Sequence, residues 1–224
     1  MDAWEVLYTT RSMRRLRPDP VPHDVQAHVL DAAIRAPSAG NAQNWRFVLV
    51  DDPLIRAEIS PFYSDSLDRV FGGPYAEAIA AAHANPAGHG ASDVLRLENS
   101  SRYLAEHFEQ IPLLLFGFVN DPLAAGTIFP AIWNAQLAGR IHGLGSTLTM
   151  ILGLFHREEI QRILAVPPDS GWEMACCVAF GYPTGTWAVA QRKPVHEVSY
   201  RNRWGADIGF EVPAPLWSRP SVEQ

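Results

Sequence analysis

The run from Ile111 to Val119 places the strongest constraint on how this chain can fold. It contains no charged or hydrogen-bonding side chain, and it is bounded by Pro112 on one side and by Asn120-Asp121-Pro122 on the other. Successive side chains of a strand point to opposite faces, so an apolar strand of this kind needs a cover on both faces. We therefore expect a buried strand inside a layered core.

Helical and β-rich segments alternate on both sides of this run. Apolar residues recur at helical spacing over 23–36, and a second helix is expected over 128–142. The segments 45–50, 147–152 and 172–180 are rich in β-forming residues and end at turn signals. Helices separated by buried strands indicate a mixed α/β layer architecture. Shorter helices are expected over 2–10 and 156–165.

Two long stretches lie outside this alternation. Residues 54–107 have a helical pattern interrupted at Gly72-Gly73-Pro74 and again at residues 85–90, and we call this part the helical excursion. Long connections of this kind often form lids or binding elements. In residues 186–224, the C-terminal extension, apolar residues recur with no clear helical or strand period. A length of 224 residues fits one domain or two, and we expect residues 1–224 to form a single domain.

The charge balance argues against polyanionic partners. The formal net charge is −6 and the isoelectric point is near 5.7, so there is no global attraction to nucleic acid or to an anionic membrane. The first residues resemble no leader peptide, and no apolar run approaches the roughly 20 residues that span a bilayer. We expect a cytoplasmic protein with no membrane segment.

The sequence contains no strong motif for metal, nucleophilic or classical nucleotide chemistry. There is no His-Glu-x-x-His, Cys-x-x-Cys, Gly-x-Ser-x-Gly or Walker pattern. Cys176 and Cys177 are adjacent in a β-rich segment and are expected to be buried, reduced thiols. His83 and His89 lie near the second break and are expected to be solvated loop histidines. We therefore predict no metal site.

The stretch from Ala36 to Trp45, the connector, joins an expected helix to an expected strand. Its small residues allow close backbone approach, Asn41 and Gln43 carry paired donors and acceptors, and an indole follows. Such a stretch can hold a flat polar heterocycle. The plainer interpretation is a capped turn in which Ser38 and Asn41 satisfy local backbone groups and Trp45 belongs to the core.

Four arginines fall within residues 11–17, the arginine segment, just before a proline-rich stretch that restricts the backbone. Converging guanidinium groups on a fixed backbone suit a phosphate. The plainer interpretation is a solvated arginine face with weak surface ion pairs. Gly143-Leu144-Gly145-Ser146 is similarly open to two interpretations, a helix C-cap or a site of close backbone approach.

Taken together and in order, these pieces resemble the nitroreductase family of FMN-dependent oxidoreductases over about residues 5–205, apart from the helical excursion. The pieces are Arg11-Ser12-Met13-Arg14, Pro18-Asp19-Pro20-Val21, Asp31-Ala32-Ala33-Ile34-Arg35-Ala36-Pro37-Ser38, Asn41-x-Gln43-x-Trp45, Gly143-Leu144-Gly145-Ser146, Gly181-Tyr182-Pro183 and Arg192-Lys193-Pro194.

The resemblance implies an α+β fold, a three-layer α/β/α sandwich around a central mixed, mainly antiparallel sheet. It also implies a homodimer in which each flavin lies at the interface and the C-terminal extension is exchanged with the partner. Each site would then require both chains. The flavin would carry the redox chemistry, so no catalytic side chain is named.

The resemblance also implies a set of cofactor-binding residues. One chain would hold the phosphate and ribityl arm with Arg11, Ser12, Arg14 and Arg192. The other chain would contribute Pro37, Ser38, Ala39 and Asn41, with Gln43 as a further candidate, and Leu144 and Gly145 would place backbone groups near the flavin ring. The family often has an arginine where this chain has Thr10, so Arg15 is an alternative phosphate ligand. It also often has a proline where this chain has Asn44.

The implied activity is electron transfer from NAD(P)H through bound FMN to a small acceptor such as a nitroaromatic or a quinone, by a ping-pong mechanism. One alternative is a specialised flavoenzyme on the same scaffold, a reductive dehalogenase or a flavin-consuming enzyme. Another is a non-catalytic flavin-binding or flavin-sequestering protein, because a fold alone does not determine a reaction.

Overall fold

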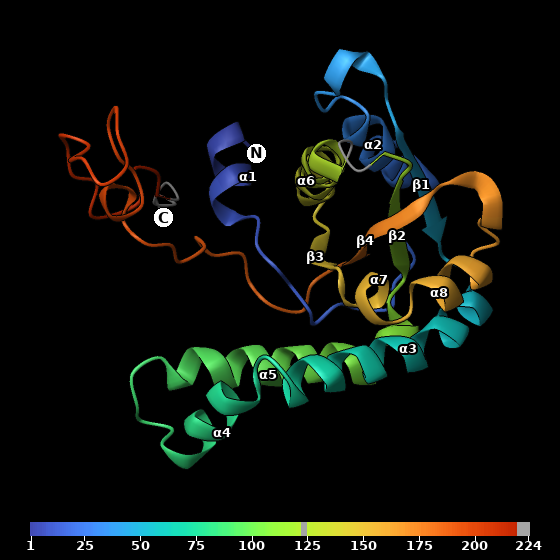
Figure 1. Cartoon of the computed structure of the whole chain (residues 1–224), viewed down its shortest axis with the longest axis horizontal. Helices are drawn as coiled ribbons and strands as arrows, with labels where there is room; N and C mark the ends of the chain where they lie inside the picture. Colours follow the sequence, from blue (N-terminus) through green and yellow to red (C-terminus); the bar gives the residue numbers. More distant parts are fainter. Residues whose placement is uncertain (122–124, 219–224) are drawn as a thin grey trace, which may run out of the picture. The chain divides into compact units, whose positions relative to one another are not determined.

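The computed structural model describes residues 1–121 and 125–218, and it divides into two compact units (Figure 1). The main unit runs from Ser12 to Gly185. The terminal unit joins Met1–Arg11 to the segment that begins at Thr186. The end of the C-terminal extension, residues 219–224, lies outside the described residues. Each unit is described by itself, and the expectation of a single domain stays a prediction.

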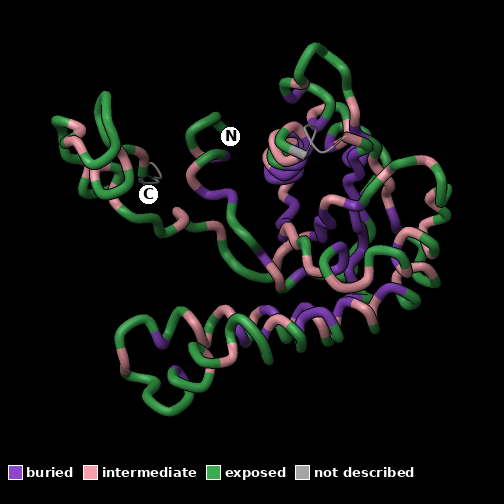
Figure 2. The backbone as a smooth tube through the Cα atoms, in the orientation of Figure 1, coloured by how far each residue is buried: buried purple, intermediate pink, exposed green. Residues whose placement is uncertain are grey.

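The main unit is built on a four-stranded sheet in the order β1-β2-β4-β3, with antiparallel pairing throughout. Its strands are β1 Trp45–Val50, β2 Leu113–Val119, β3 Gly145–Thr149 and β4 Glu173–Gly181. Every residue of β2 is buried, which confirms the expectation of a strand covered on both faces. The sheet holds much of the buried part of the unit (Figure 2). An isolated parallel bridge joins Ser12 to Ser146.

Helices cover both faces of this sheet. On one face, α2 (His23–Ala33) and α6 (Ala125–Ile141) share a core with the β4 side chains of Cys176, Val178 and Phe180. Covering the other face are α3 (Pro53–Gly72), α7 (Ile151–Phe155) and α8 (Arg157–Ile163). These layers form the expected α/β/α sandwich.

The helical excursion contains α3, α4 (Ala76–Ala84) and α5 (Ala91–Glu106), with breaks at both expected positions. A Cβ on Gly73 would lie 2.9 Å from the Arg69 carbonyl oxygen, which explains a glycine directly after α3. Gly90 has φ = 74° and begins α5 from the left-handed region, where glycine is favoured. In Figure 1, α3 and α5 lie side by side and α4 lies at their far end from the sheet.

The expected boundaries need two corrections. The strand predicted over 147–152 instead begins at Gly145 and ends at Thr149, and Ile151–Phe155 is helical. A short apolar run does not by itself distinguish a strand from a buried helix. The helix predicted over 23–36 ends at Ala33, because Arg35 and Ala36 make tighter turn bonds to the carbonyls three residues earlier.

The terminal unit contains one α-helix, α1 (Ala3–Thr9), within its described residues. Asp2 caps this helix by accepting a 2.7 Å hydrogen bond from the Glu5 amide. The Tyr8 ring lies against Trp217 with a centroid distance of 5.8 Å, and the Ala190 amide donates to the Tyr8 carbonyl at 3.1 Å. These contacts tie the helix to the irregular C-terminal extension.

Candidate functional site

Backbone hydrogen bonds fix the arginine segment to the ends of β3 and β4. The Met13 amide donates to the Ser146 carbonyl at 2.9 Å, next to the Ser12–Ser146 bridge. Further along, the Arg17 amide donates to the Tyr182 carbonyl at 2.8 Å. These bonds hold Ser12 and Arg14 beside the start of β3.

Gly145 allows this close approach because it has no side chain. A Cβ at this position would lie 3.1 Å from each of Leu16 Cδ2, Met13 Cβ and Pro183 Cβ. The side chain of the preceding residue, Leu144, is buried in the core. Leu144 and Gly145 therefore have only backbone groups to offer a ligand.

The helix-cap interpretation of this stretch also holds. Gly143 has φ = 80°, and the Leu144 amide donates to the Gly139 carbonyl at 2.8 Å, so the stretch caps α6. One short turn thus ends α6 and begins β3 beside the arginine segment.

Arg14 is a half-buried cation that no described carboxylate neutralises. Its Nη1 donates a long hydrogen bond of 3.5 Å to Ser100 Oγ of α5. Burial lowers the pKa of the Arg14 guanidinium, and the nearby Tyr63 and Tyr75 oppose that shift. Within residues 1–121 and 125–218 it forms no ion pair, unlike Arg17, which pairs with Asp19 at 3.3 Å. A desolvated guanidinium of this kind is suited to an anionic ligand.

Arg15, the alternative phosphate ligand, lies in different surroundings. Its guanidinium carbon is 4.2 Å from the centre of the Tyr103 ring, a cation–π contact. The Tyr103 ring also stacks on His107, with a centroid distance of 4.0 Å. The Arg15 side chain therefore already has an aromatic partner on α5.

Arg11 and Arg192 belong to the terminal unit. Arg11 Nη2 donates to the Thr186 carbonyl at 3.2 Å, and Arg192 Nη1 donates to the Gln191 carbonyl at 2.7 Å. Both residues are exposed. Their assignment to the phosphate stays a prediction.

The connector combines exposure with an unusual backbone. Gly40, Asn41 and Gln43 have φ values of 58°, 54° and 51°. Outside glycine this region costs roughly 1–2 kcal/mol per residue. The turn is held internally, because Ser38 Oγ accepts from the Gln43 amide at 2.8 Å and Gln43 Nε2 donates to Asn41 Oδ1 at 3.2 Å.

Pro37, Ala39, Asn41 and Gln43 are exposed and Ser38 is half-buried. The indole of Trp45 is instead buried in the core, as the plainer interpretation expected. Exposed residues held in a strained turn are typical of binding sites. The capped turn therefore exists, and among the described residues its hydrogen bonds use Asn41 Oδ1 and Gln43 Nε2 but neither Asn41 Nδ2 nor Gln43 Oε1.

The connector and Gly145 lie at opposite ends of the sheet. Trp45, which ends the connector, pairs with Val119 at one end of β2. Gly145 begins β3 at the other end, where its neighbour Ser146 pairs with Phe180 and Phe180 pairs with Leu113. The length of β2 from Leu113 to Val119 corresponds to about 20 Å at roughly 3.3 Å per residue. One chain therefore brings Ser12, Arg14, Leu144 and Gly145 together, without the connector.

Sequence reasoning missed the contribution of α5. Ser100 and Tyr103 contact Arg14 and Arg15, although they lie 86 residues or more along the chain from them. Nothing in the sequence around Ser100 identifies it, because serine is common on exposed helix faces. The signals in the sequence were the uneven helical pattern of the excursion and its aromatic residues, Tyr103 among them, which suggested a lid or cover but paired no residue with an arginine.

The interpretation of His83 as a solvated loop histidine is half right, because its side chain is exposed but it belongs to a helix. His83 lies in the last turn of α4, and its Nε2 is 2.7 Å from Oε2 of the buried Glu98. Cys176 and Cys177 are buried and free, as expected. No group of three potential metal ligands was found among the described residues.

The comparisons with known proteins agree with this fold. Residues 7–182 match the model of the Nitroreductase family. A 5,6-dimethylbenzimidazole synthase of Rhodobacter capsulatus is 29% identical over 196 residues, covering 81% of this chain and 84% of the relative. An NADH dehydrogenase of Thermus thermophilus is 28% identical over 210 residues, covering 88% of this chain and 95% of the relative.

Solved structures share the fold at lower identity. An FMN-dependent nitroreductase from Mycobacterium smegmatis, in complex with NADPH, has a TM-score of 0.65 at 19% identity and covers 90% of this chain and 98% of its own. An iodotyrosine deiodinase bound to FMN and 3-iodo-L-tyrosine has a TM-score of 0.68 at 20% identity, covering 89% and 98%.

The layered α+β fold and the ordered motifs define a class of oxidoreductases. This chain belongs to the nitroreductase family. Its described helices include none that is both long and apolar enough to cross a membrane.

Proposed function

We propose that this protein is an FMN-dependent oxidoreductase that takes electrons from NAD(P)H and passes them to a small electron-poor acceptor. The observation that carries the proposal is the half-buried Arg14 guanidinium, which no described carboxylate neutralises. It belongs to a backbone segment that is fixed against Gly145 and Ser146. Relatives and structural neighbours named as an NADH dehydrogenase and as FMN-bound or NADPH-bound nitroreductases support it.

The residues present fit FMN by their chemistry. The phosphate of FMN is an anion, and the Arg14 and Ser12 side chains supply a charged and a neutral donor without a competing carboxylate. The flavin ring has a polar edge with donors and acceptors, which suits the exposed amides of Asn41 and Gln43. Arg11, Arg192 and the backbone of Leu144 complete the proposed set.

When bound, FMN supplies two-electron transfer between a nicotinamide and an acceptor. The chain's own residues would bind and orient it: guanidinium groups would neutralise the phosphate, and backbone groups near Gly145 would hold the flavin ring. No side-chain nucleophile is assigned. Burial raises the pKa of the Cys176 thiol to about 12 and holds the pKa of the Cys177 thiol well above its ordinary value, so neither is a thiolate at neutral pH.

Two copies of the chain would form each site. The connector and Gly145 are separated by the length of the sheet within one chain, so a partner's connector would complete the site next to Arg14. A homodimer with two shared sites meets this requirement. The exchange of the C-terminal extension and a cytoplasmic location belong to the same proposal.

The proposal is tested by loading the purified protein with FMN, recording its visible spectrum, and titrating it with NADH and NADPH under anaerobic conditions. We expect a stoichiometric flavin spectrum that bleaches with either nucleotide and returns repeatedly on adding a quinone or a nitroaromatic. A folded protein that binds no flavin would contradict the proposal. One that binds FMN but never turns over would instead be a flavin-sequestering protein.

A second candidate is a specialised flavoenzyme on the same scaffold. Relatives named 5,6-dimethylbenzimidazole synthase and iodotyrosine deiodinase support this second candidate. The two candidates differ in the fate of the flavin or the substrate. Intact FMN recovered after repeated reduction and exposure to air supports the oxidoreductase, whereas loss of FMN indicates a flavin-consuming enzyme, and halide release from a haloaromatic indicates a dehalogenase.

A further inference from the structure

Helix α5 of the helical excursion contacts both arginines that could face the phosphate. Ser100 and Tyr103 are three residues apart, so they share one face of the helix. Ser100 Oγ lies 3.5 Å from Arg14 Nη1, and the Tyr103 ring centre lies 4.2 Å from the Arg15 guanidinium carbon.

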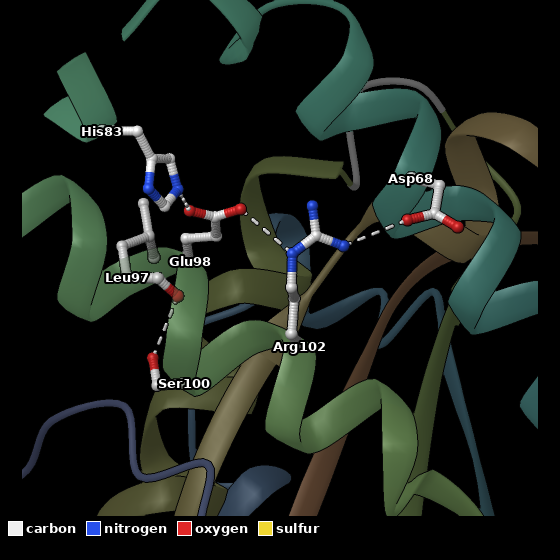
Figure 3. Close-up of polar contacts among 6 residues, drawn as sticks. All are labelled: Asp68, His83, Leu97, Glu98, Ser100 and Arg102. Carbon is white, nitrogen blue, oxygen red and sulfur yellow. Dashed lines mark hydrogen bonds and ion pairs between the residues drawn. The ribbon is translucent and has the colours of Figure 1, made fainter. Parts of the chain in front are cut away.

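The Ser100 hydroxyl is oriented to accept from Arg14. A serine hydroxyl has one proton to donate, and Ser100 gives it to the Leu97 carbonyl at 3.1 Å (Figure 3). The lone pairs of Ser100 Oγ are then left to accept the Arg14 N–H. The hydroxyl therefore restricts where the guanidinium lies and leaves its other donors uncommitted.

A charged network holds α5 in place. The buried Glu98 carboxylate accepts from Arg102 Nε at 3.0 Å and lies 2.7 Å from His83 Nε2 of α4. Arg102 Nη1 also reaches Asp68 of α3 at 3.4 Å (Figure 3). The network ties α5 to both neighbouring helices, so Ser100 and Tyr103 project from a fixed support.

We propose that Ser100 and Tyr103 are positioning residues: Ser100 directs the Arg14 guanidinium toward an anionic group of bound FMN, and Tyr103 holds Arg15 away from it. This inference rests on the proposed function. It makes the helical excursion a support for the cofactor site. It also assigns the contact with FMN to Arg14 and not to Arg15. The anionic group is either the phosphate or the reduced flavin ring, and the experiment distinguishes them.

The first test compares Ser100→Ala with Ser100→Thr, which keeps the hydroxyl, and with Asn99→Ala, an exposed neighbour on the same helix. Dissociation constants for FMN and for riboflavin, which lacks the phosphate, come from flavin fluorescence quenching. The midpoint potential of bound FMN comes from a redox-dye titration. Thermal unfolding of each apoprotein checks its folding.

If Arg14 faces the phosphate, Ser100→Ala weakens FMN binding about fivefold and leaves riboflavin binding unchanged. If Arg14 faces the reduced ring, the same change lowers the midpoint potential and leaves the binding of oxidised FMN unchanged. Ser100→Thr and Asn99→Ala retain wild-type values in both cases. A folded Ser100→Ala protein with wild-type constants and potential would overturn the role of Ser100.

The second test concerns Tyr103 and uses a gain of binding. In an Arg14→Gln background, Tyr103→Leu frees Arg15 and raises the FMN affinity at least about threefold above that of Arg14→Gln alone. Tyr103→Phe keeps the ring and leaves the affinity at the Arg14→Gln level. Equal affinities for the two double variants would overturn the role of Tyr103. Wild-type protein that binds neither FMN nor riboflavin would instead defeat the proposed function itself.

Discussion

At the scale of single residues, Gly145 sets the position of the arginine segment. Its missing side chain lets Met13, Leu16 and Pro183 approach to distances at which a methyl group would be crowded. The same contacts hold Ser12 and Arg14 beside β3. A substitution here is therefore expected to affect both stability and cofactor binding.

We predict that Gly145→Ala lowers the free energy of unfolding by about 1–3 kcal/mol, because the added Cβ overpacks the site. FMN affinity falls with it, since the backbone of the arginine segment must shift. Gly72→Ala is the matched control, because a Cβ there meets nothing within 4 Å. Urea unfolding of both apoproteins and FMN titrations check this, and a Gly145→Ala protein as stable as wild type would contradict it.

The strained turn at Gln43 leads to a different expectation. Gln43→Gly removes a non-glycine residue with φ = 51°, so the unfolding free energy stays constant or rises by up to about 1 kcal/mol. FMN binding nevertheless weakens, because the side-chain amide is lost. Ala165→Gly is the control, since Ala165 has φ = 53° and lies outside the proposed site. Wild-type FMN affinity in Gln43→Gly would remove Gln43 from the site.

The sequence predicted part of the site at this scale. Ser12 and Arg14 were identifiable because their spacing and the prolines that follow form a local pattern. Ser100 and Tyr103 were not, because their roles depend on how α5 packs against a segment far away in the chain. The burial of Trp45, which the plainer interpretation of the connector expected, follows from the packing of α2 and the sheet.

At the scale of elements, the buried carboxylate of Glu98 connects α5 to α4 and, through Arg102, to α3. Partial desolvation raises the pKa of Glu98, but hydrogen bonds from His83 and Arg102 outweigh it, and the pKa lies below its ordinary value. A carboxyl with a lowered folded-state pKa binds protons more readily when the protein is unfolded. Its stabilising contribution is therefore complete above the unfolded pKa and is lost as the pH falls through the folded one.

We predict that Glu98→Gln lowers the free energy of unfolding at pH 7 by about 1–3 kcal/mol. The difference from wild type shrinks as the pH falls below about 4.3, the ordinary pKa of a glutamate, because wild-type Glu98 then becomes protonated. Urea unfolding above and below this pH measures the difference. Glu77→Gln, an exposed position on α4 without an ion pair in the described part of the chain, keeps the wild-type pH dependence. A pH-independent difference for Glu98→Gln would contradict the assignment.

Elements with a long, regular pattern were predictable. The runs that became α2, β2 and β4 have clear periods or an unbroken apolar character, and they appear near their expected positions. The segment after Gly145 was not, because its strand and the following helix α7 are each only five residues long and are separated by a single residue. Pairing of Gly145 with Gly181 decides where the strand begins, and that contact is not visible in the local sequence.

At the scale of the whole molecule, the account depends on a site shared between two chains. The connector and Gly145 occupy opposite ends of one sheet, and the strand register fixes this separation independently of any side chain. The family resemblance predicted a shared site, and the register gives it a physical reason. The exchange of the C-terminal extension with the partner chain rests on the family resemblance alone, because its sequence has no clear hydrophobic period.

The most direct measurement is complementation between two differently tagged variants. One chain carries Arg14→Gln and the other carries Asn41→Ala with Gln43→Ala, and the heterodimer is isolated through both tags from cells that express the two together. In a shared site, one of its two pockets combines two intact halves. We predict one FMN per heterodimer bound with wild-type affinity, while both homodimers bind weakly. A heterodimer with no wild-type pocket would contradict the account, because each site would then lie within a single chain.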